Sequence, residues 1–302
     1  PRRLLVAIGR FGVDQLFGSP ALMAVLAAHG APLPGLMRVT SAGAPVPAWV
    51  VARMRELLPE QAQFWTPYGA TECLPVAVIE GRELQATRQA TELGAGTCVG
   101  RAVPPNQVRI IRIQDQAIPE WSDQLLSSVG EVGEITVAGP SVTDSYYNRD
   151  AATALAKIHE RRDDGSERIV HRMGDLGYLD SEGRLWFCGR KSHRVETSTG
   201  PLYTEQVEPV FNQHPQVRRT ALVGIGTIAA QQPVLCVELA AGVPRRAWLR
   251  IERELHQLAQ TQAHTMQIAR YMRHPGFPVD IRHNAKIGRE RLALWVQRRA
   301  GG

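Results

Sequence analysis

The segment Thr-Pro-Tyr-Gly-Ala-Thr-Glu combines residue types that suit a nucleotide site. Tyr68 offers a ring on which a base can stack, and the small residues Gly69 and Ala70 allow a ligand to approach the backbone closely. Thr71 has a hydroxyl for a phosphate oxygen, and Glu72 has a carboxylate, a ligand type that Mg²⁺ prefers. The segment therefore predicts a site for a nucleotide and its magnesium ion. The alternative is a turn that carries a carboxylate by chance.

A second candidate is Asp175, which stands between Gly174 and an apolar run. A carboxylate can accept two hydrogen bonds from the vicinal hydroxyls of a ribose. The run contains two strand-like stretches, Leu176–Leu179 and Arg184–Cys188, separated by a polar turn that ends at Gly183, and this pattern predicts a β-hairpin. From these residues alone, Asp175 fits either a ribose clamp or an aspartate that caps the turn.

Two further loops carry candidate residues. The triplet Gly43-Ala44-Pro45 follows a strand-like stretch and precedes a helical one, and its small side chains leave space for a flat ring against the backbone. In isolation, the triplet also fits a simple connection between a strand and a helix. Near the end of the chain, Lys286 and Arg289 lie on a polar loop that leads into a helix, where a lone lysine is usually surface charge.

Hydrophobic periodicity and turn residues predict helices and strands around these candidates. One helix has Ser19 as its N-cap and Gly30 as its stop. The expected helices cover residues 19–30, 47–57, 206–212 and 248–258, and the expected strands cover residues 36–40, 107–113, 133–140, 220–223 and 234–239. The pattern indicates an α/β fold, with a small β-barrel-like part within residues 98–140 and a small α+β part near the C-terminus.

Composition and charge set the broad class of the protein. A chain of 302 residues, with 44% hydrophobic and 21% charged residues, can bury the cores of two domains. The formal charge is +6, but the arginines are scattered and not interleaved with aromatic residues, so no binding to nucleic acid is expected. No apolar run reaches the length of a transmembrane helix, so no membrane span is expected.

The cysteines and the first residues bear on the compartment and on the extent of the chain. The four cysteines are far apart, which argues against a disulfide framework or a zinc site and suits the reducing cytoplasm. The chain starts at Pro1, without an initiator methionine or a signal-peptide pattern. We therefore expect it to be a fragment whose N-terminal part is missing.

The order Arg-Met-Gly-Asp-Leu, hairpin, Gly-Arg-Lys resembles the adenylate-forming superfamily, which includes acyl-CoA synthetases, peptide-synthetase adenylation domains and luciferases. The segment at Tyr68 resembles the Tyr-Gly-x-Thr-Glu motif of the same family. The resemblance implies that ATP and Mg²⁺ are the cofactors, with Thr71 on a phosphate and Glu72 on the magnesium ion. It places the following residues around the nucleotide: Gly43, Ala44, Pro45, Tyr68, Gly69, Ala70, Thr71, Asp175 and Arg190.

The same resemblance implies two domains joined by a hinge. Asp175 would bind the ribose, and Arg190 would mark the hinge, with the pivot near Ser192, where the family often has Asp or Lys. Residues 1–190 would then be the C-terminal part of the large domain that binds ATP and the acyl group. Residues 191–302 would be a small, mobile C-terminal domain.

Lys286 and Arg289 match the Gly-Lys-x-x-Arg motif at the end of the family, although Ala285 replaces its usual glycine. The family's lysine reaches into the active site during adenylation, so the resemblance implies a catalytic role for Lys286. The family's phosphate loop, rich in Ser, Thr and Gly, is absent from this sequence. The chain by itself is therefore not expected to turn over substrate.

Three stretches, Tyr68–Ile79, Gly189–Thr197 and His283–Arg289, resemble the β-lactone synthetases of bacterial olefin biosynthesis. This resemblance implies that the enzyme activates a long-chain 2-alkyl-3-hydroxy fatty acid as acyl-AMP. The hydroxyl of the substrate would then displace AMP to close a β-lactone. Ser198-Thr199-Gly200 stands where CoA ligases commonly carry a Gly-Gly loop beside the pantetheine tunnel, which fits a reaction without a thiol acceptor.

Two other functions stay open. The first is a long-chain fatty acyl-CoA ligase or a fatty acyl-AMP ligase. The second is a non-catalytic nucleotide-binding subunit, against which the presence of Glu72, Asp175 and Lys286 argues. For the lactone function, the resemblance implies a β-lactone decarboxylase and a reductase of the olefin pathway as partners.

Overall fold

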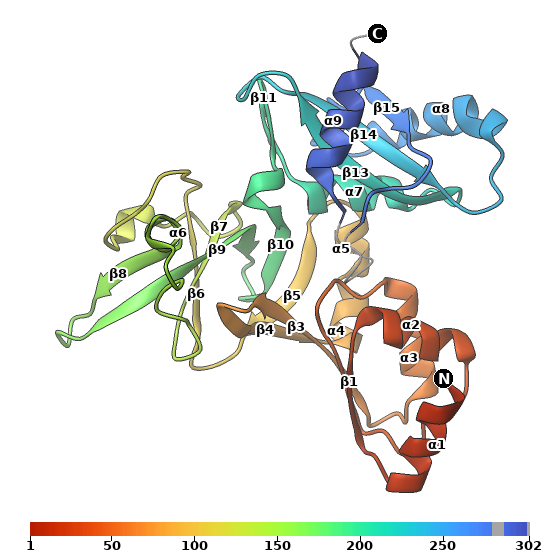
Figure 1. Cartoon of the computed structure of the whole chain (residues 1–302), viewed down its shortest axis with the longest axis horizontal. Helices are drawn as coiled ribbons and strands as arrows, with labels where there is room; N and C mark the ends of the chain where they lie inside the picture. The colour runs from red at the N-terminus through yellow and green to blue at the C-terminus, as the bar shows by residue number, and fades with distance from the viewer. Residues whose placement is uncertain (280–286, 301–302) are drawn as a thin grey trace. The chain divides into compact units, whose positions relative to one another are not determined.

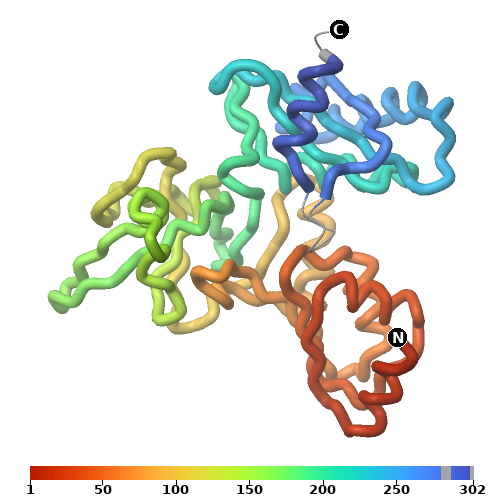
Figure 2. Tube along the Cα trace, in the orientation of Figure 1, coloured from red at the N-terminus to blue at the C-terminus, as the bar shows by residue number. Residues whose placement is uncertain are grey.

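The computed structural model describes residues 1–279 and 287–300, and the chain forms two compact units. The first unit comprises Pro1–Arg88 and Cys98–Trp186, and the second comprises Gln89–Thr97 and Phe187–Gly302. Figure 1 labels the elements of both units, and Figure 2 follows the chain from its red start in the first unit to its blue end in the second. The domain boundary expected after residue 190, with the pivot near Ser192, stays a prediction.

The first unit begins with a parallel sheet. Its strands pair in sequence order, in parallel: β1 (Gln15–Gly18), β2 (Arg38–Ser41) and β3 (Gln63–Ala70). Parallel strands need crossover connections, and helices provide them here. The carboxyl ends of these strands therefore lie at the same edge of the sheet, followed by the loops that carry candidate residues.

Three helices accompany the parallel strands: α1 (Arg2–Phe11), α2 (Pro20–His29) and α3 (Ala48–Leu57). The predicted caps of α2 are present, because Oγ of Ser19 accepts a hydrogen bond from the backbone N of Leu22 at 3.3 Å and Gly30 has a φ of 72°. Met23, Val39 and Phe64 are fully buried in the shared core. Helix and strand thus bury the apolar faces that their sequence periodicity predicts.

The sheet continues with antiparallel strands. β4 (Cys73–Glu80) pairs with β3, and β5 (Thr97–Ala102) pairs with β4. The connection between β4 and β5 contains α4 (Gly81–Ala86) and α5 (Arg88–Glu92). The strand order is β1-β2-β3-β4-β5-β10-β9-β7-β6, and β8 pairs with β9.

An antiparallel group follows, with a small core of its own. It consists of β6 (Gln107–Ile111), β7 (Gly133–Ala138), β8 (Lys157–Arg161) and β9 (Glu167–Leu179), with η1 (Asp123–Leu125) and α6 (Asp150–Ala156) in the connections. Ile111, Ile158 and Val170 are fully buried there. The strands predicted within residues 107–113 and 133–140 are present, although each ends two residues earlier than predicted, whereas the small β-barrel stays a prediction.

The hairpin predicted after Asp175 is present, but its first strand is longer than expected. Since β9 begins at Glu167, Asp175 lies inside a strand and is 3% exposed. The turn to β10 (Leu185–Arg190) is held by Asp180, whose Oδ1 accepts hydrogen bonds from the backbone N atoms of Glu182 and Arg184 at 3.0 and 2.9 Å. The alternative that Asp175 caps this turn is therefore wrong.

The second unit is a three-stranded sheet with helices on both faces. The strands are β13 (Val217–Ile225), β14 (Gln232–Leu239) and β15 (Arg270–Arg273), and the helices are α7 (Thr204–Asn212), α8 (Trp248–Ala259) and α9 (Arg289–Ala300). Leu222 and Leu235 pack with α7 and α8, whereas Val223 and Val234 pack with α9 (Figure 1). Alternate residues of each strand thus serve two cores, which explains the near-continuous apolar runs.

Short elements join β10 to this sheet and connect its parts. They are η2 (Lys191–His193), the antiparallel hairpin of β11 (Val195–Thr197) and β12 (Gly200–Leu202), and η3 (Arg245–Ala247). The helices and strands predicted in this part are confirmed within longer elements. The architecture is a mixed α/β fold, as expected.

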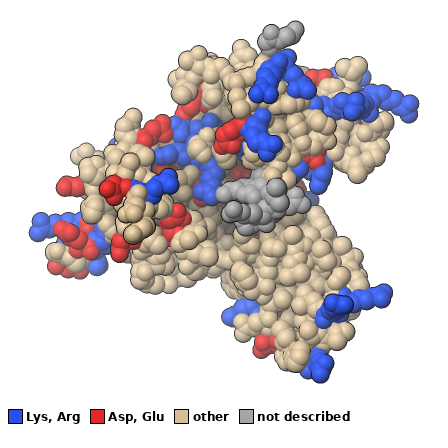
Figure 3. Space-filling model, viewed as in Figure 1, with Lys and Arg blue, Asp and Glu red and all other residues tan. Residues whose placement is uncertain are grey.

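Apolar side chains are unevenly spread over the surface. Phe11, Phe17 and Trp49 are each more than half exposed, and the face of the α1–α3 region visible in Figure 3 carries few charged side chains. All four cysteines are buried free thiols. Within residues 1–279 and 287–300, no helix has the length and apolar character needed to cross a membrane.

A buried ion pair ties β7 to β9. Nη2 of Arg172 lies 2.6 Å from Oε2 of Glu134, and both side chains are 1% exposed. The Arg172 guanidinium also donates hydrogen bonds to the carbonyl oxygens of Gln116 and Leu155 at 2.7 and 3.1 Å. Arg172 therefore fixes the strand that carries Asp175.

We predict that Arg172→Met lowers the free energy of unfolding by about 3–5 kcal/mol, because the substitution breaks a buried ion pair by removing one of its two charges. Urea unfolding followed by tryptophan fluorescence measures the change. Arg161→Met is the matched control, since Arg161 is exposed at the end of β8. Equal stability of the two variants would show that the pair does not hold the strand.

Candidate active site

Two of the predicted loops follow the carboxyl ends of neighbouring strands. Gly43-Ala44-Pro45 follows the carboxyl end of β2, and Thr71 and Glu72 follow the carboxyl end of β3. The two strands are neighbours in parallel register, with Arg38 opposite Gln63. In open α/β sheets, ligands bind outside the carboxyl ends of the strands, so this edge is the expected place for a nucleotide.

The β3–β4 hairpin presents Thr71 and Glu72 at its tip. Ala70 pairs with Cys73, so the two residues between them form the turn. A Cβ at Gly69 would lie 2.6 Å from the carbonyl oxygen of Cys73, so only glycine fits without a shift of the backbone. Thr71 is exposed and Glu72 is half-buried, which leaves both available to a ligand at the tip.

Tyr68 and Asp175 are in direct contact. The Tyr68 hydroxyl donates a hydrogen bond of 2.7 Å to Oδ2 of Asp175, across 107 positions of the sequence. Gly174 has a φ of 66°, which turns the backbone immediately before Asp175. The fold thus brings the predicted base-stacking residue and the predicted ribose ligand together, and Asp175 is a buried acceptor as a ribose clamp requires.

Glu72 has partners that the sequence did not indicate. Its Oε1 accepts a hydrogen bond of 2.8 Å from the Tyr146 hydroxyl, and its backbone oxygen accepts one of 2.9 Å from the N of Thr143. Burial raises the pKa of Glu72, but the hydrogen bond from Tyr146, a backbone hydrogen bond and the positive charge of Lys157 outweigh it, and the pKa lies below its ordinary value. Glu72 is therefore an anion at neutral pH.

Two buried bases stand near Glu72. Lys157 is 3% exposed, and burial lowers the pKa of its amine, although Glu72 and Asp144 act in the opposite direction. His171 is 2% exposed, and burial together with the charge of Lys157 lowers its pKa to about 4. His171 is thus neutral at pH 7. No motif marked these residues, since Lys157 and His171 are 85 and 99 positions from Glu72 in the sequence.

The oxygen donors at the hairpin tip fit a magnesium ion that arrives with a nucleotide. Mg²⁺ is usually bound through one or two carboxylates together with the phosphates of the substrate. Glu72 supplies an anionic carboxylate, and Thr71 supplies a hydroxyl next to it. Among the described residues, no group of three or more His, Cys, Asp or Glu side chains could hold a metal ion by itself. The donor set therefore suits a shared site better than a closed protein cage.

The remaining predicted residues belong to the second unit. Arg190 ends β10 and precedes η2. Arg289 binds both carboxylate oxygens of Glu208, at 2.5 and 3.0 Å, and so fixes the start of α9 against α7. Lys286 and Ala285 lie outside the described residues, so the role of Lys286 stays a prediction.

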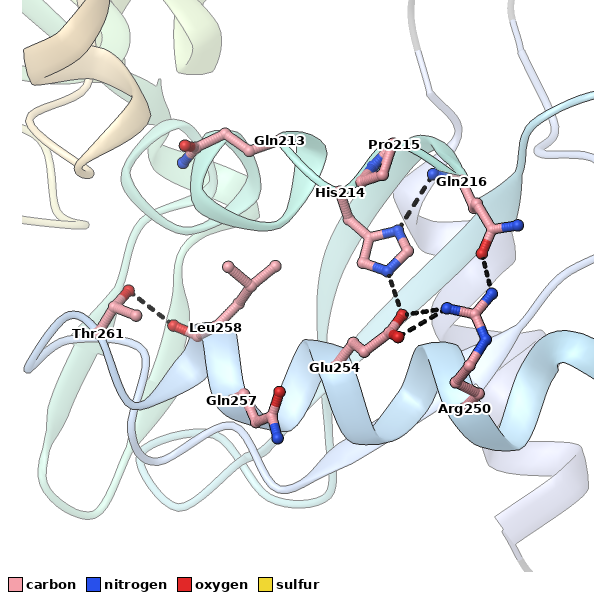
Figure 4. A pocket seen from close by; sticks show the side chains of 9 residues that line it. All are labelled: Gln213, His214, Pro215, Gln216, Arg250, Glu254, Gln257, Leu258 and Thr261. Atoms are coloured by element: carbon pink, nitrogen blue, oxygen red, sulfur yellow. Dashed lines mark hydrogen bonds and ion pairs between the residues drawn. The ribbon is translucent and has the colours of Figure 1, made fainter.

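A pocket in the second unit contains none of the predicted residues. It is lined by Gln213, His214, Pro215, Gln216, Arg250, Glu254, Gln257, Leu258 and Thr261 (Figure 4). His214 lies 2.8 Å from Glu254, and Arg250 binds both oxygens of the same carboxylate. These polar groups satisfy one another, so the pocket offers a structural network and no group poised for chemistry.

Known proteins resemble this chain in sequence. The sequence model of the family described as AMP-binding enzyme matches residues 1–147. An olefin beta-lactone synthetase of Xanthomonas campestris pv. campestris is 70% identical over 296 residues, which are 98% of this chain and 53% of that protein. The chain therefore spans about half the length of this curated relative.

Solved structures share the fold. An amide bond synthetase from Marinactinospora thermotolerans matches with a TM-score of 0.74 and 25% identity, over 98% of this chain and 55% of that chain. The O-succinylbenzoate coenzyme A synthetase of Bacillus subtilis, solved with ATP and a magnesium ion, matches with a TM-score of 0.69 and 22% identity, over 96% of this chain and 54% of that one. Residues 1–147 thus match the family of AMP-binding enzymes, and the chain as a whole shares the fold of these solved structures.

The pKa of His171 predicts how stability depends on pH. Because its folded-state pKa of about 4 lies below the unfolded value of about 6.5, the unfolded chain binds more protons between these values. The free energy of unfolding is therefore highest above pH 6.5 and falls as the pH falls, by roughly 2 kcal/mol at pH 5. We predict that His171→Gln reduces this loss, as measured by urea unfolding at pH 7 and pH 5.

The control for this experiment is His159→Gln, because His159 is exposed on the neighbouring strand β8. This variant should retain the pH dependence of the unchanged protein. If His171→Gln loses as much stability between pH 7 and pH 5 as the control, a group other than His171 causes the acid sensitivity.

Proposed function

We propose that the protein is an ATP-dependent β-lactone synthetase of the adenylate-forming superfamily. The observation that carries this proposal is the 70% identity to an olefin beta-lactone synthetase over 98% of the chain. The contact between Tyr68 and Asp175, together with the anionic Glu72 at the hairpin tip, supports a nucleotide site. We infer that the chain is the C-terminal part of the large domain, including a small β-barrel, followed by a small mobile domain.

In the first step, a carboxylate oxygen of a long-chain 2-alkyl-3-hydroxy fatty acid attacks the α-phosphorus of ATP. The bond from this phosphorus to pyrophosphate breaks, and acyl-AMP forms. Such transfers depend mostly on positioning and on neutralising charge. In this proposal Asp175 holds the ribose, Tyr68 and Gly43-Ala44-Pro45 contact the adenine, and Lys286 neutralises the charge that develops on the carboxylate and phosphate oxygens.

The residues at the hairpin tip have separate tasks. Thr71 orients a phosphate oxygen, and Glu72 holds Mg²⁺, which neutralises phosphate charge when it is bound. Gly69 and Ala70 leave the approach to the backbone open, because they carry little or no side chain. Arg190 marks the hinge about which the small domain moves.

In the second step, the 3-hydroxyl oxygen of the bound acyl-AMP attacks its acyl carbon. The bond between this carbon and the AMP oxygen breaks, AMP departs, the hydroxyl proton passes to solvent water, and a four-membered lactone closes. The nucleophile is part of the substrate, so proximity replaces the binding of a second reactant. This step needs no thiol acceptor.

The setting of the reaction follows from the same proposal. A β-lactone decarboxylase and a reductase of olefin biosynthesis would be the partners. The four free, buried thiols support a reducing compartment, and we place the protein in the cytoplasm. Activity is to be tested on the full-length enzyme, because the chain covers 53% of the relative on which the proposal rests.

We predict that the full-length enzyme, given a long-chain 2-alkyl-3-hydroxy acid, ATP and Mg²⁺, forms a β-lactone, AMP and pyrophosphate without CoA. Mass spectrometry of the products, with and without CoA, makes the measurement. The matched control substrate is the same acid without the 3-hydroxyl, which should stop at acyl-AMP. An acyl-CoA that forms from the hydroxy acid only when CoA is added would identify a conventional ligase instead.

We predict that Lys286→Ala lowers the rate of pyrophosphate release by at least about 100-fold, since one charged group that stabilises a transition state is worth that much. ATP binding should stay nearly unchanged, as measured by calorimetry. Arg298→Ala removes an exposed cation of α9 and should leave the rate unaltered. Pyrophosphate release at the normal rate in Lys286→Ala would exclude the role assigned to this lysine.

A further inference from the structure

The contact between Tyr146 and Glu72 has a place in the proposed function, on which the following inference rests. We propose that Tyr146 is a positioning residue that holds the Glu72 carboxylate in the orientation needed to bind the magnesium ion of the nucleotide. The Tyr146 hydroxyl donates a hydrogen bond of 2.8 Å to Oε1 of Glu72. Among the described residues, Oε2 of Glu72 accepts no hydrogen bond, so the contact leaves one oxygen for a cation.

The segment that carries Tyr146 is fixed at both ends. The backbone N of Thr143 donates to the backbone oxygen of Glu72 at 2.9 Å, and the backbone N of Tyr146 donates to Oγ1 of Thr153 at 3.0 Å. The ring of Tyr146 lies 5.9 Å from Nζ of Lys157. The backbone that carries the Tyr146 hydroxyl is therefore fixed relative to Glu72. The turn at the hairpin tip would not by itself fix the orientation of the Glu72 carboxylate.

Lys157 holds the segment that carries Tyr146 through hydrogen bonds to Thr143. Its buried ammonium donates hydrogen bonds to Oγ1 of Thr143, at 3.0 Å, and to the backbone oxygen of Thr143. Its charge lies near Glu72 but forms no ion pair with it among the described residues. This ammonium thus donates to Thr143 and, within the part of the chain that the structure describes, to neither carboxylate oxygen of Glu72.

Orientation matters here because, within residues 1–279 and 287–300, Glu72 does not belong to a group of three or more side chains that could hold a metal ion. Mg²⁺ demands near-ideal octahedral geometry, and carboxylates that bind metals are themselves held by hydrogen bonds whose loss typically weakens metal binding by 10–100-fold. A site with several carboxylates can adjust when one rotates. A site with one carboxylate depends on the group that fixes it, which is Tyr146.

The test compares two neighbouring tyrosines in the full-length enzyme. Tyr146→Phe removes only the hydroxyl that contacts Glu72, and Tyr147→Phe removes the hydroxyl of a residue that is 90% exposed. ATP binding is measured by calorimetry with Mg²⁺ and, separately, with EDTA. Tyr146→Phe should bind ATP about tenfold more weakly with Mg²⁺ and within about twofold of normal with EDTA, whereas Tyr147→Phe should match the unchanged enzyme in both.

Other outcomes separate this inference from the proposed function. A loss of ATP affinity that is equal with Mg²⁺ and with EDTA would mean that Tyr146 supports the fold only, and would overturn the inference. Glu72→Gln should abolish the gain in affinity that Mg²⁺ provides. If Glu72→Gln does so and Tyr146→Phe does not, the inference fails while the magnesium role of Glu72 stands. If neither substitution changes that gain, the role of Glu72 itself is wrong.

Discussion

The hydrogen bond between Tyr68 and Asp175 is the contact on which the candidate site depends. It joins β3, which ends the parallel part of the sheet, to β9, which belongs to the antiparallel part. Burying a carboxylate costs free energy unless the carboxylate is hydrogen-bonded. The contact with Tyr68 therefore both stabilises the buried Asp175 and sets the orientation of its side chain. The parallel register of β2 and β3 then places the Gly43-Ala44-Pro45 loop beside the same edge.

The buried ionisable side chains near this edge are either paired, hydrogen-bonded or neutral, and the pairs also hold the strands in place. Arg172 neutralises Glu134 and holds the strand on which Asp175 lies, whereas His171 avoids a buried charge by staying neutral at pH 7. Lys157 keeps its ammonium bonded to backbone and hydroxyl oxygens. Glu72 is consequently the anion that the tip of the hairpin can present to a cation, which suits chemistry in which a nucleotide brings its own magnesium ion.

The geometry of the candidate site and the sequence identity to known proteins are two separate observations that support the proposed chemistry. The proposed nucleotide site, with one carboxylate assigned to the metal ion, is compatible with many adenylate-forming reactions, because the fold alone does not determine which group accepts the acyl group. The 70% identity to an olefin beta-lactone synthetase supports the proposal that the group which accepts the acyl carbon is a hydroxyl of the substrate itself. The turn of Ser198 and Thr199 between β11 and β12 is in keeping with that choice, since the β11–β12 hairpin carries hydroxyl side chains there and no Gly-Gly pair.

The sequence by itself determined the local elements and the motif residues. Caps such as Ser19 and the glycine of the hairpin turn act within a few positions, so α2 and the β9–β10 hairpin could be predicted from their own residues. Only the tertiary structure decided that Asp180 caps the turn and that Asp175 is buried on Tyr68, because β9 begins earlier than its apolar pattern indicates. Tyr146 had no local signal either, since its hydroxyl acquires a role only when folding brings it to Glu72, 74 positions away.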